Sequence, residues 1–99
     1  MRLIEIAHAR AGDKGNIVTL SLIAHRAEDF PLLEQCVTAD RVAQHFDEFL
    51  DGPVERYELA QLSALNFVLR RKKEYSVTRS LAIDAHGKCF SSALLAMDI

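Results

Sequence analysis

The sequence predicts a two-layer α+β sandwich, in which a mostly antiparallel sheet has helices packed on it. Apolar residues alternate with polar ones across 17–25, which is the period of a strand, and recur at helical spacing across 38–50. Segments of the two kinds intermingle without the strict alternation that a parallel sheet requires. These patterns favour separate strands and helices that share one core.

Length and composition fit a single small domain that covers residues 1–99. A chain of 99 residues has room for one compact core. With 49% hydrophobic and 26% charged residues, the chain falls outside the class of disordered proteins. Glu5 interrupts the short apolar run at the amino terminus, so neither a signal peptide nor a membrane span is expected there. We therefore expect a cytoplasmic protein with no membrane partner.

Charge and ligand spacing argue against nucleic acids, metals and cofactors. The formal charge is −2, which does not supply the positive field that nucleic-acid binders need. Cys36 and Cys89 lie far apart in the chain and fit neither a disulfide framework nor a zinc or iron–sulfur site. The four histidines include no pair at metal-binding spacing. No metal, cofactor or nucleic-acid partner is expected.

The expected strands begin near the amino terminus. Residues 2–8 are short and apolar and predict a strand that buries Ile4, Ile6 and His8. The polar stretch 10–16 contains two glycines and predicts a loop. Residues 17–25 then predict a second strand, antiparallel to the first.

Helices are expected at 30–36 and 38–50. Pro31 suits the first turn of the former, and Thr38 suits the N-cap of the latter. Gly52 and Pro53 provide a stop after the second helix.

The second half predicts a strand at 54–59, a helix at 61–71 and a strand at 77–84. The helix at 61–71 is apolar almost all round and is expected to be buried. The basic run 70–73 then marks a solvated helix end, where cations favour the helix dipole. Residues 90–97 suggest a final helix, although a strand also fits them.

Three ordered groups of residues carry a resemblance to a known family. They are Ala9–Asn16, then Arg56–Leu59 with Ala64–Leu69, then Ser80-Leu81 with Asp84, Gly87-Lys88 and Leu94-Leu95. The chain resembles, over essentially its whole length, the small domain of the acyclic-terpene-utilisation protein A family. In that family a large domain is commonly followed by a small domain of ferredoxin-like fold. The resemblance implies a stand-alone small domain linked to the catabolism of branched acyl compounds, and it implies no activity for the small domain.

The sequence departs from the family pattern at three places. Ala11 stands where the family usually has serine, Ala60-Gln61 where it usually has Pro-Asn, and residues 70–75 where it has a glycine-rich stretch. The last departure removes any role that a flexible glycine loop has in relatives.

The candidate ligand site lies in the segment 10–16. Its members are Arg10, Gly12, Asp13, Lys14, Gly15 and Asn16. Glycines let main-chain N–H groups approach an anion, and two cations add positive charge. A plain hairpin turn explains the same composition and is favoured, because the spacing is not that of a nucleotide-binding loop.

Asn66 is the other candidate. On a buried helix its amide needs hydrogen-bond partners, since leaving them out costs about 1–3 kcal/mol. The amide would either orient a substrate carbonyl or tie the backbone of a neighbouring loop, such as 10–16. The second interpretation is favoured.

Three hypotheses of function follow. The preferred one is an accessory subunit or interaction domain of a larger enzyme that processes acyl compounds of terpene type. The second is an independent binding module for an anionic small molecule such as an acyl-CoA, and the third is a small lyase or hydrolase that uses Asp13 and Lys14. We expect a homo-oligomer or a complex with a large-domain partner, formed through a sheet edge or through the apolar helix 61–70.

Overall fold

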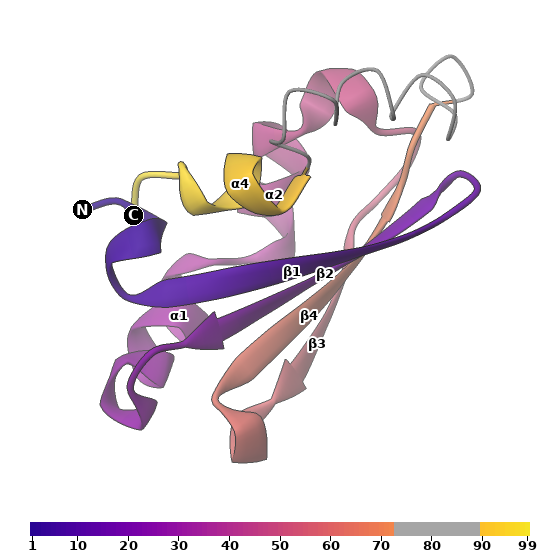
Figure 1. The fold of residues 1–99 in the computed structure, drawn as a ribbon. Helices are drawn as coiled ribbons and strands as arrows, with labels where there is room; N and C mark the ends of the chain where they lie inside the picture. The colour runs from indigo at the N-terminus through magenta and orange to yellow at the C-terminus, as the bar shows by residue number, and fades with distance from the viewer. Residues whose placement is uncertain (73–89) are drawn as a thin grey trace.

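Two β-hairpins build a four-stranded antiparallel sheet in the computed structural model, which describes residues 1–72 and 90–99 and, for Asp13, the backbone alone (Figure 1). The strands lie in the order β1-β2-β4-β3. Their bounds are Ala7–Lys14 for β1, Ile17–Ala24 for β2, Glu55–Leu59 for β3 and Ala64–Arg70 for β4. The α+β class and the strands expected at 17–25 and 54–59 are confirmed. Cys89 and the strand expected at 77–84 lie outside the described residues.

In the described residues, three α-helices pack on one face of this sheet. They are α1 (Phe30–Cys36), α2 (Ala39–His45) and α4 (Phe90–Leu95). Pro31 lies in the first turn of α1, and the Thr38 hydroxyl accepts the N–H of Arg41 at 3.1 Å, so both expected helix starts are confirmed. The helix expected over 38–50 is interrupted, because α2 ends at His45 and a 3₁₀ turn follows at Asp47–Phe49. None of the helices in the described part has the length and apolar character to cross a membrane.

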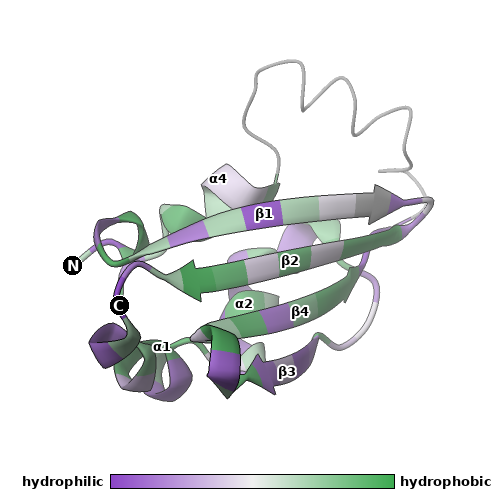
Figure 2. Cartoon of the chain, turned by 60° about the horizontal axis from the view of Figure 1, so that its bottom comes forward, coloured by the Kyte–Doolittle hydropathy of each residue, from purple (hydrophilic) through white to green (hydrophobic). Residues whose placement is uncertain are grey.

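The core lies between the sheet and the helices. Alternate residues of the two central strands face it, and they pair directly across β2 and β4: Val18 with Leu69, Leu20 with Phe67, and Leu22 with Leu65. All six are at most 1% exposed. Phe30 and Leu33 from α1, Val42 from α2 and Leu94 from α4 complete the same cluster. In Figure 2 the molecule is turned so that the bottom of Figure 1 comes forward, and the strands lie in front of the helices.

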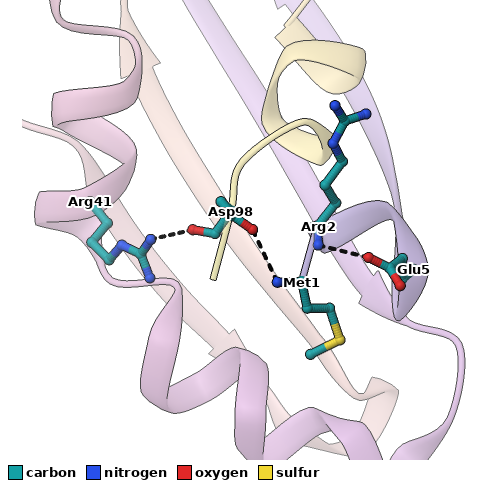
Figure 3. Close-up of polar contacts among 5 residues, drawn as sticks. All are labelled: Met1, Arg2, Glu5, Arg41 and Asp98. Carbon is teal, nitrogen blue, oxygen red and sulfur yellow. Dashed lines mark hydrogen bonds and ion pairs between the residues drawn. The ribbon is translucent and has the colours of Figure 1, made fainter.

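The strand expected at 2–8 is wrong in its bounds, because the first strand, β1, begins at Ala7. Leu3–Glu5 forms a 3₁₀ turn, in which the carboxylate of Glu5 accepts the N–H of Arg2 at 2.8 Å (Figure 3). Such local hydrogen bonds compete with a sheet ladder. Leu3 is therefore buried, Ile4 is 55% exposed, and His8 is exposed rather than buried.

The loop expected at 10–16 is also wrong. Strand β1 continues to Lys14, and only Gly15 and Asn16 form the hairpin turn before β2. Gly15 has φ of 64°, which a two-residue hairpin turn requires and glycine adopts without strain. Gly12, the first glycine of the segment, lies in the ladder opposite Thr19.

The α-helix expected at 61–71 is wrong, because Ala60–Leu62 forms a 3₁₀ turn and Ala64–Arg70 forms the central strand β4. The segment is apolar at both the helical and the strand period, so periodicity alone does not separate the two. Pairing with β2 decides the outcome, because it buries Leu65, Phe67 and Leu69 within the chain's own core. The apolar helix 61–70, which is one of the two interfaces expected from the sequence, is therefore absent from this segment.

Arg71 is buried rather than solvated. It follows β4 and is 2% exposed. Its guanidinium donates to the carbonyl of Gly15, and its N–H donates to the carbonyl of Asn16 at 2.6 Å. Leu50 forms a β-bridge with the same residue. Arg71 thus ties the end of β4 to the β1–β2 turn and to the segment that follows α2.

The first and last described residues lie side by side (Figure 3). The amino group of Met1 contacts Asp98 Oδ1 at 3.1 Å, and the N–H of Leu3 donates to the carbonyl of Met97 at 2.9 Å. Arg41 from α2 donates to the carbonyl of Asp98 at 2.5 Å. These contacts hold the segment after α4 against the rest of the domain.

The strand assignment of β4 makes Phe67 a core residue and Leu62 a surface residue. We expect Phe67→Ala to lower the free energy of unfolding by about 3–5 kcal/mol, because it empties the centre of the core. Leu62 is 67% exposed, so Leu62→Ala should cost no more than about 0.5 kcal/mol. Urea unfolding followed by circular dichroism measures both. Equal losses would contradict the assignment.

Candidate functional site

No described helix or turn packs on the face of the sheet opposite the helices, and we call it the open face (Figure 2). Because strand residues alternate between the two faces, the positions between the core residues belong to it. By register these positions are His8, Arg10, Gly12 and Lys14 on β1, Ile17, Thr19, Ser21 and Ile23 on β2, Ala64, Asn66, Val68 and Arg70 on β4, and Glu55, Tyr57 and Leu59 on β3.

One row of side chains crosses the middle of the open face. Arg10 pairs with Ser21, Ser21 pairs with Asn66, and Asn66 pairs with Tyr57. The Ser21 hydroxyl donates to Asn66 Oδ1 at 2.7 Å. Asn66 is half-buried on a strand, and the described partner of its side chain is this hydroxyl. The expectation that its amide ties the backbone of segment 10–16 is therefore wrong.

Tyr57 ends this row at the β3 edge of the sheet. Its hydroxyl donates to Glu55 Oε1 at 2.5 Å, and this hydrogen bond raises the pKa of Tyr57 above its usual value. The Coulombic effect of the Glu55 carboxylate acts in the same direction. The tyrosine therefore stays neutral and keeps the one carboxylate of the open face engaged.

Three cations of the open face are exposed and have no counter-ion in the described part of the chain. They are Arg10, Lys14 and Arg70. Lys14 and Arg70 both pair with Ile17, from opposite sides, so their Cα atoms lie about 10 Å apart. Arg10 lies four residues before Lys14 on the same strand, at about 14 Å. The cations thus gather toward the hairpin end of the face.

Gly12 leaves a gap in this surface between Arg10 and Lys14. The Thr19 hydroxyl donates a long hydrogen bond of 3.5 Å to the carbonyl of Gly12. A Cβ atom at position 12 would lie 2.8 Å from that hydroxyl, closer than real contacts allow. The glycine therefore lets the side chain of Thr19 lie against the β1 backbone.

The structure brings together four of the seven residues named from the sequence. Arg10, Gly12, Lys14 and Asn66 share the open face, whereas Gly15 and Asn16 form the turn beyond it. The backbone of Asp13 pairs with Val18. Because residues 10–14 run along β2 as a ladder, their N–H groups do not converge into a concave anion cradle. Any anion site here depends on the side chains.

Sequence reasoning missed Ser21, Tyr57 and Arg70. Ser21 and Asn66 are 45 positions apart in sequence, so only the strand pairing brings them together. The alternation within 17–25 carried a usable signal, since it sets Thr19 and Ser21 on the face opposite Leu20 and Leu22. The sequence predicts Arg70 at the end of a helix, so its position on the sheet, at the end of β4, could not be recognised.

The described side chains of the open face are suited to binding rather than to catalysis. The Ser21 hydroxyl is bonded to an amide oxygen, which cannot act as the base that a serine nucleophile needs. His8 stacks on His25 with ring centroids 5.5 Å apart, at the end of the face away from Lys14 and Arg70. Within residues 1–72 and 90–99, no three His, Cys, Asp or Glu residues gather as metal ligands.

A second polar cluster lies on the helix side of β3. Arg56 Nη1 donates to the carbonyls of Glu34 and Val37, at 2.9 and 2.8 Å, and so caps the carboxyl end of α1. Arg56 Nη2 lies 3.3 Å from Glu58 Oε2 and forms an ion pair with this carboxylate. The cluster fixes α1 to the sheet and leaves the open face free.

Glu34 and Glu58 meet at this cluster. A hydrogen bond with Glu58, followed by repulsion from its charge, raises the pKa of Glu34. The same hydrogen bond, helped by Arg56 against the effect of burial, lowers the pKa of Glu58. The pKa shifts of the two carboxyl groups therefore have opposite signs, and so do the effects of these shifts on the pH dependence of stability.

The opposite pKa shifts of Glu34 and Glu58 predict how the stability of two variants depends on pH. Because its pKa is lowered in the folded state, Glu58 stabilises the fold at pH values above the usual pKa of glutamate. This contribution is lost as the pH falls through the lowered pKa. A raised pKa makes Glu34 stabilising at low pH, and that contribution is lost as the pH rises through the raised value. We expect Glu34→Gln to gain stability relative to the parent, and Glu58→Gln to lose it, as the pH rises from about 4 to about 7. Urea unfolding at several pH values checks this, and parallel profiles for the two variants would contradict it.

The comparisons with known proteins agree with the fold. The family model of the AtuA ferredoxin-like domain matches residues 1–99, which is the whole chain. No curated protein and no solved structure matches the chain. The match confirms the resemblance carried by the sequence motifs. The four-stranded antiparallel sheet with helices on one face is consistent with a ferredoxin-like fold. The chain belongs to the AtuA ferredoxin-like domain family.

Proposed function

We propose that this chain is an accessory domain that docks onto a larger enzyme of acyl-compound catabolism and has no activity alone. The observation that carries the proposal is the open face itself. The described helices all pack on the opposite side of the sheet, and the open face offers exposed cations, polar groups and aliphatic side chains to a partner. Surfaces of this mixed character are typical of protein contacts.

The shape of the surface also favours a protein partner over a small substrate. Small-molecule sites are concave and enclose most of their ligand. Two hollows in the described part, of 230 and 300 Å³, lie at the end of the domain where Arg2 and Asp98 meet. Neither is lined by a residue of the open face.

Family membership links the proposal to acyl compounds of terpene type. The resemblance that the sequence carries associates the family with their catabolism and places the small domain beside a large one. In this proposal the small domain completes a large-domain partner. This supports an accessory role and leaves the substrate with the partner.

Purification of the tagged chain from its native cells tests the proposal. We expect a larger enzyme to co-purify in a fixed ratio and to turn over its acyl substrate only when the small chain is present. A second preparation, with the complex separated by salt and then recombined, should lose and regain activity. Turnover by the isolated chain, or a chain that purifies without a partner, would overturn the accessory role.

An anionic small molecule such as an acyl-CoA is the second candidate ligand. The exposed cations Arg10, Lys14 and Arg70, with Asn66 and Ser21 beside them, favour this candidate. Phosphate groups would contact the cations, and the amide and hydroxyl would supply hydrogen bonds.

The double variant Arg10→Ala, Lys14→Ala tests this candidate. If an acyl-CoA binds here, calorimetry should show the variant binding at least about tenfold more weakly than the parent. Arg26→Ala is the control, because Arg26 is exposed and pairs with Glu28 away from the open face. Both variants should keep the circular dichroism spectrum of the parent, since the residues are exposed. Equal binding by the double variant would remove the candidate.

A further inference from the structure

We propose that the open face docks a partner protein whose surface presents carboxylates to Arg10, Lys14 and Arg70, and that the occupant is not a second copy of this chain. The inference rests on the accessory role proposed above and names the surface and the chemistry of the partner. Three properties of the open face support it: its net charge, the distances between its cations, and the apolar character of its opposite end.

The charge of the open face is opposite in sign to that of the whole chain. Among the described strand positions, this face has three cations and one carboxylate, Glu55, which gives these positions a net charge of +2, on a chain with a formal charge of −2. Glu55 accepts a hydrogen bond from Tyr57 and lies at the far edge from Arg10 and Lys14. The cations are therefore available to carboxylates of a partner.

The spacing of the cations defines what the partner must offer. Lys14 and Arg70 are about 10 Å apart across the sheet, and Arg10 is about 14 Å from Lys14 along β1. A rigid surface with two or three acidic side chains at these spacings would pair with them simultaneously. Thr19 and Val68 lie between the cations and bring the partner into van der Waals contact.

The opposite end of the open face is apolar. Ile23 and Leu59 lie in its last row with His8 and with Ala64, which is only 3% exposed. Leu59 is 40% exposed, and Leu62, in the turn that follows β3, is 67% exposed. This end lies about 20 Å from Lys14 and Arg70 along the strands. A partner with an apolar patch and an acidic patch at that separation would dock in one orientation.

A second copy does not supply this chemistry. In a symmetric dimer through the open face, the surface meets itself, so each copy offers one carboxylate to three cations. At least two cations per copy would be buried without a counter-ion or would face like charges, which is costly. The charge of the face thus favours a different protein.

The open face is too small to be the whole of a stable contact. Four strands span about 19 Å, and the strands are about 24 Å long, which gives on the order of 450 Å² on this side of the contact. Standard stable interfaces bury about 800 Å² per partner, so a complex that survives purification also uses surface beyond the open face. Covalent capture in the cell shows whether the open face is part of that contact.

The test places the photo-crosslinking residue p-benzoylphenylalanine at position 19 or at position 44 of the full chain in its native cells. Thr19 is exposed on the open face, where Gly12 leaves room for a larger side chain, and Gln44 is exposed on α2. We expect capture of one other protein from position 19, through a segment that contains Asp or Glu. Arg10→Glu with Lys14→Glu should lower the yield at least about tenfold. Arg2→Glu with Arg26→Glu changes the net charge equally and should leave the yield unchanged.

Each other result overturns the inference. Capture from position 44 but not from position 19 would leave the accessory role standing and remove the open face as its surface. Capture of a second copy from position 19, or a yield insensitive to the charge reversal, would also reject it. No capture from either position would count against both the inference and the accessory role. If the reversed variant fails to fold by circular dichroism, Arg10→Gln with Lys14→Gln replaces it, with a loss of at least about fivefold expected.

Discussion

The antiparallel pairing of β2 with β4 is the constraint on which the rest of the structure depends. It joins two hairpins that are distant in sequence and sets Leu20 opposite Phe67 in the core. The same register sets Ser21 opposite Asn66 on the open face. Because strand side chains alternate, a slip by one residue would send every core side chain of one strand to the solvent face. A single register therefore creates both the buried layer and the surface available to a partner.

Elements whose signals are local could be predicted from the sequence. The alternation of 17–25, the proline in the first turn of α1 and the Thr38 cap depend on neighbouring residues, and the structure has all three. The segment around Phe67 could not be assigned in this way. Its apolar residues fit a buried helix as well as a buried strand, and the strand β2 that decides between them lies more than forty positions earlier.

The residues of the candidate site also differ in whether neighbouring residues in the sequence could reveal them. Arg10, Gly12 and Lys14 could be named because glycines and cations cluster in a short segment, although the segment is a strand and a turn rather than a loop. Arg70 and Arg71 are adjacent and chemically identical, yet one is exposed on the open face and the other is buried. The sequence could not distinguish them, because the carbonyl that Arg71 binds belongs to Gly15, 56 positions away.

That contact has a consequence for the rate and strength of association. Lys14 directly precedes the turn that Arg71 holds, and Arg70 directly precedes Arg71. Hairpin tips are commonly mobile, and ordering them on binding costs conformational entropy. Here the backbone that bears these two cations is fixed to the rest of the domain before any partner arrives. The hairpin end is thus preorganised, and an encounter with an acidic surface needs only side-chain adjustment rather than loop rearrangement.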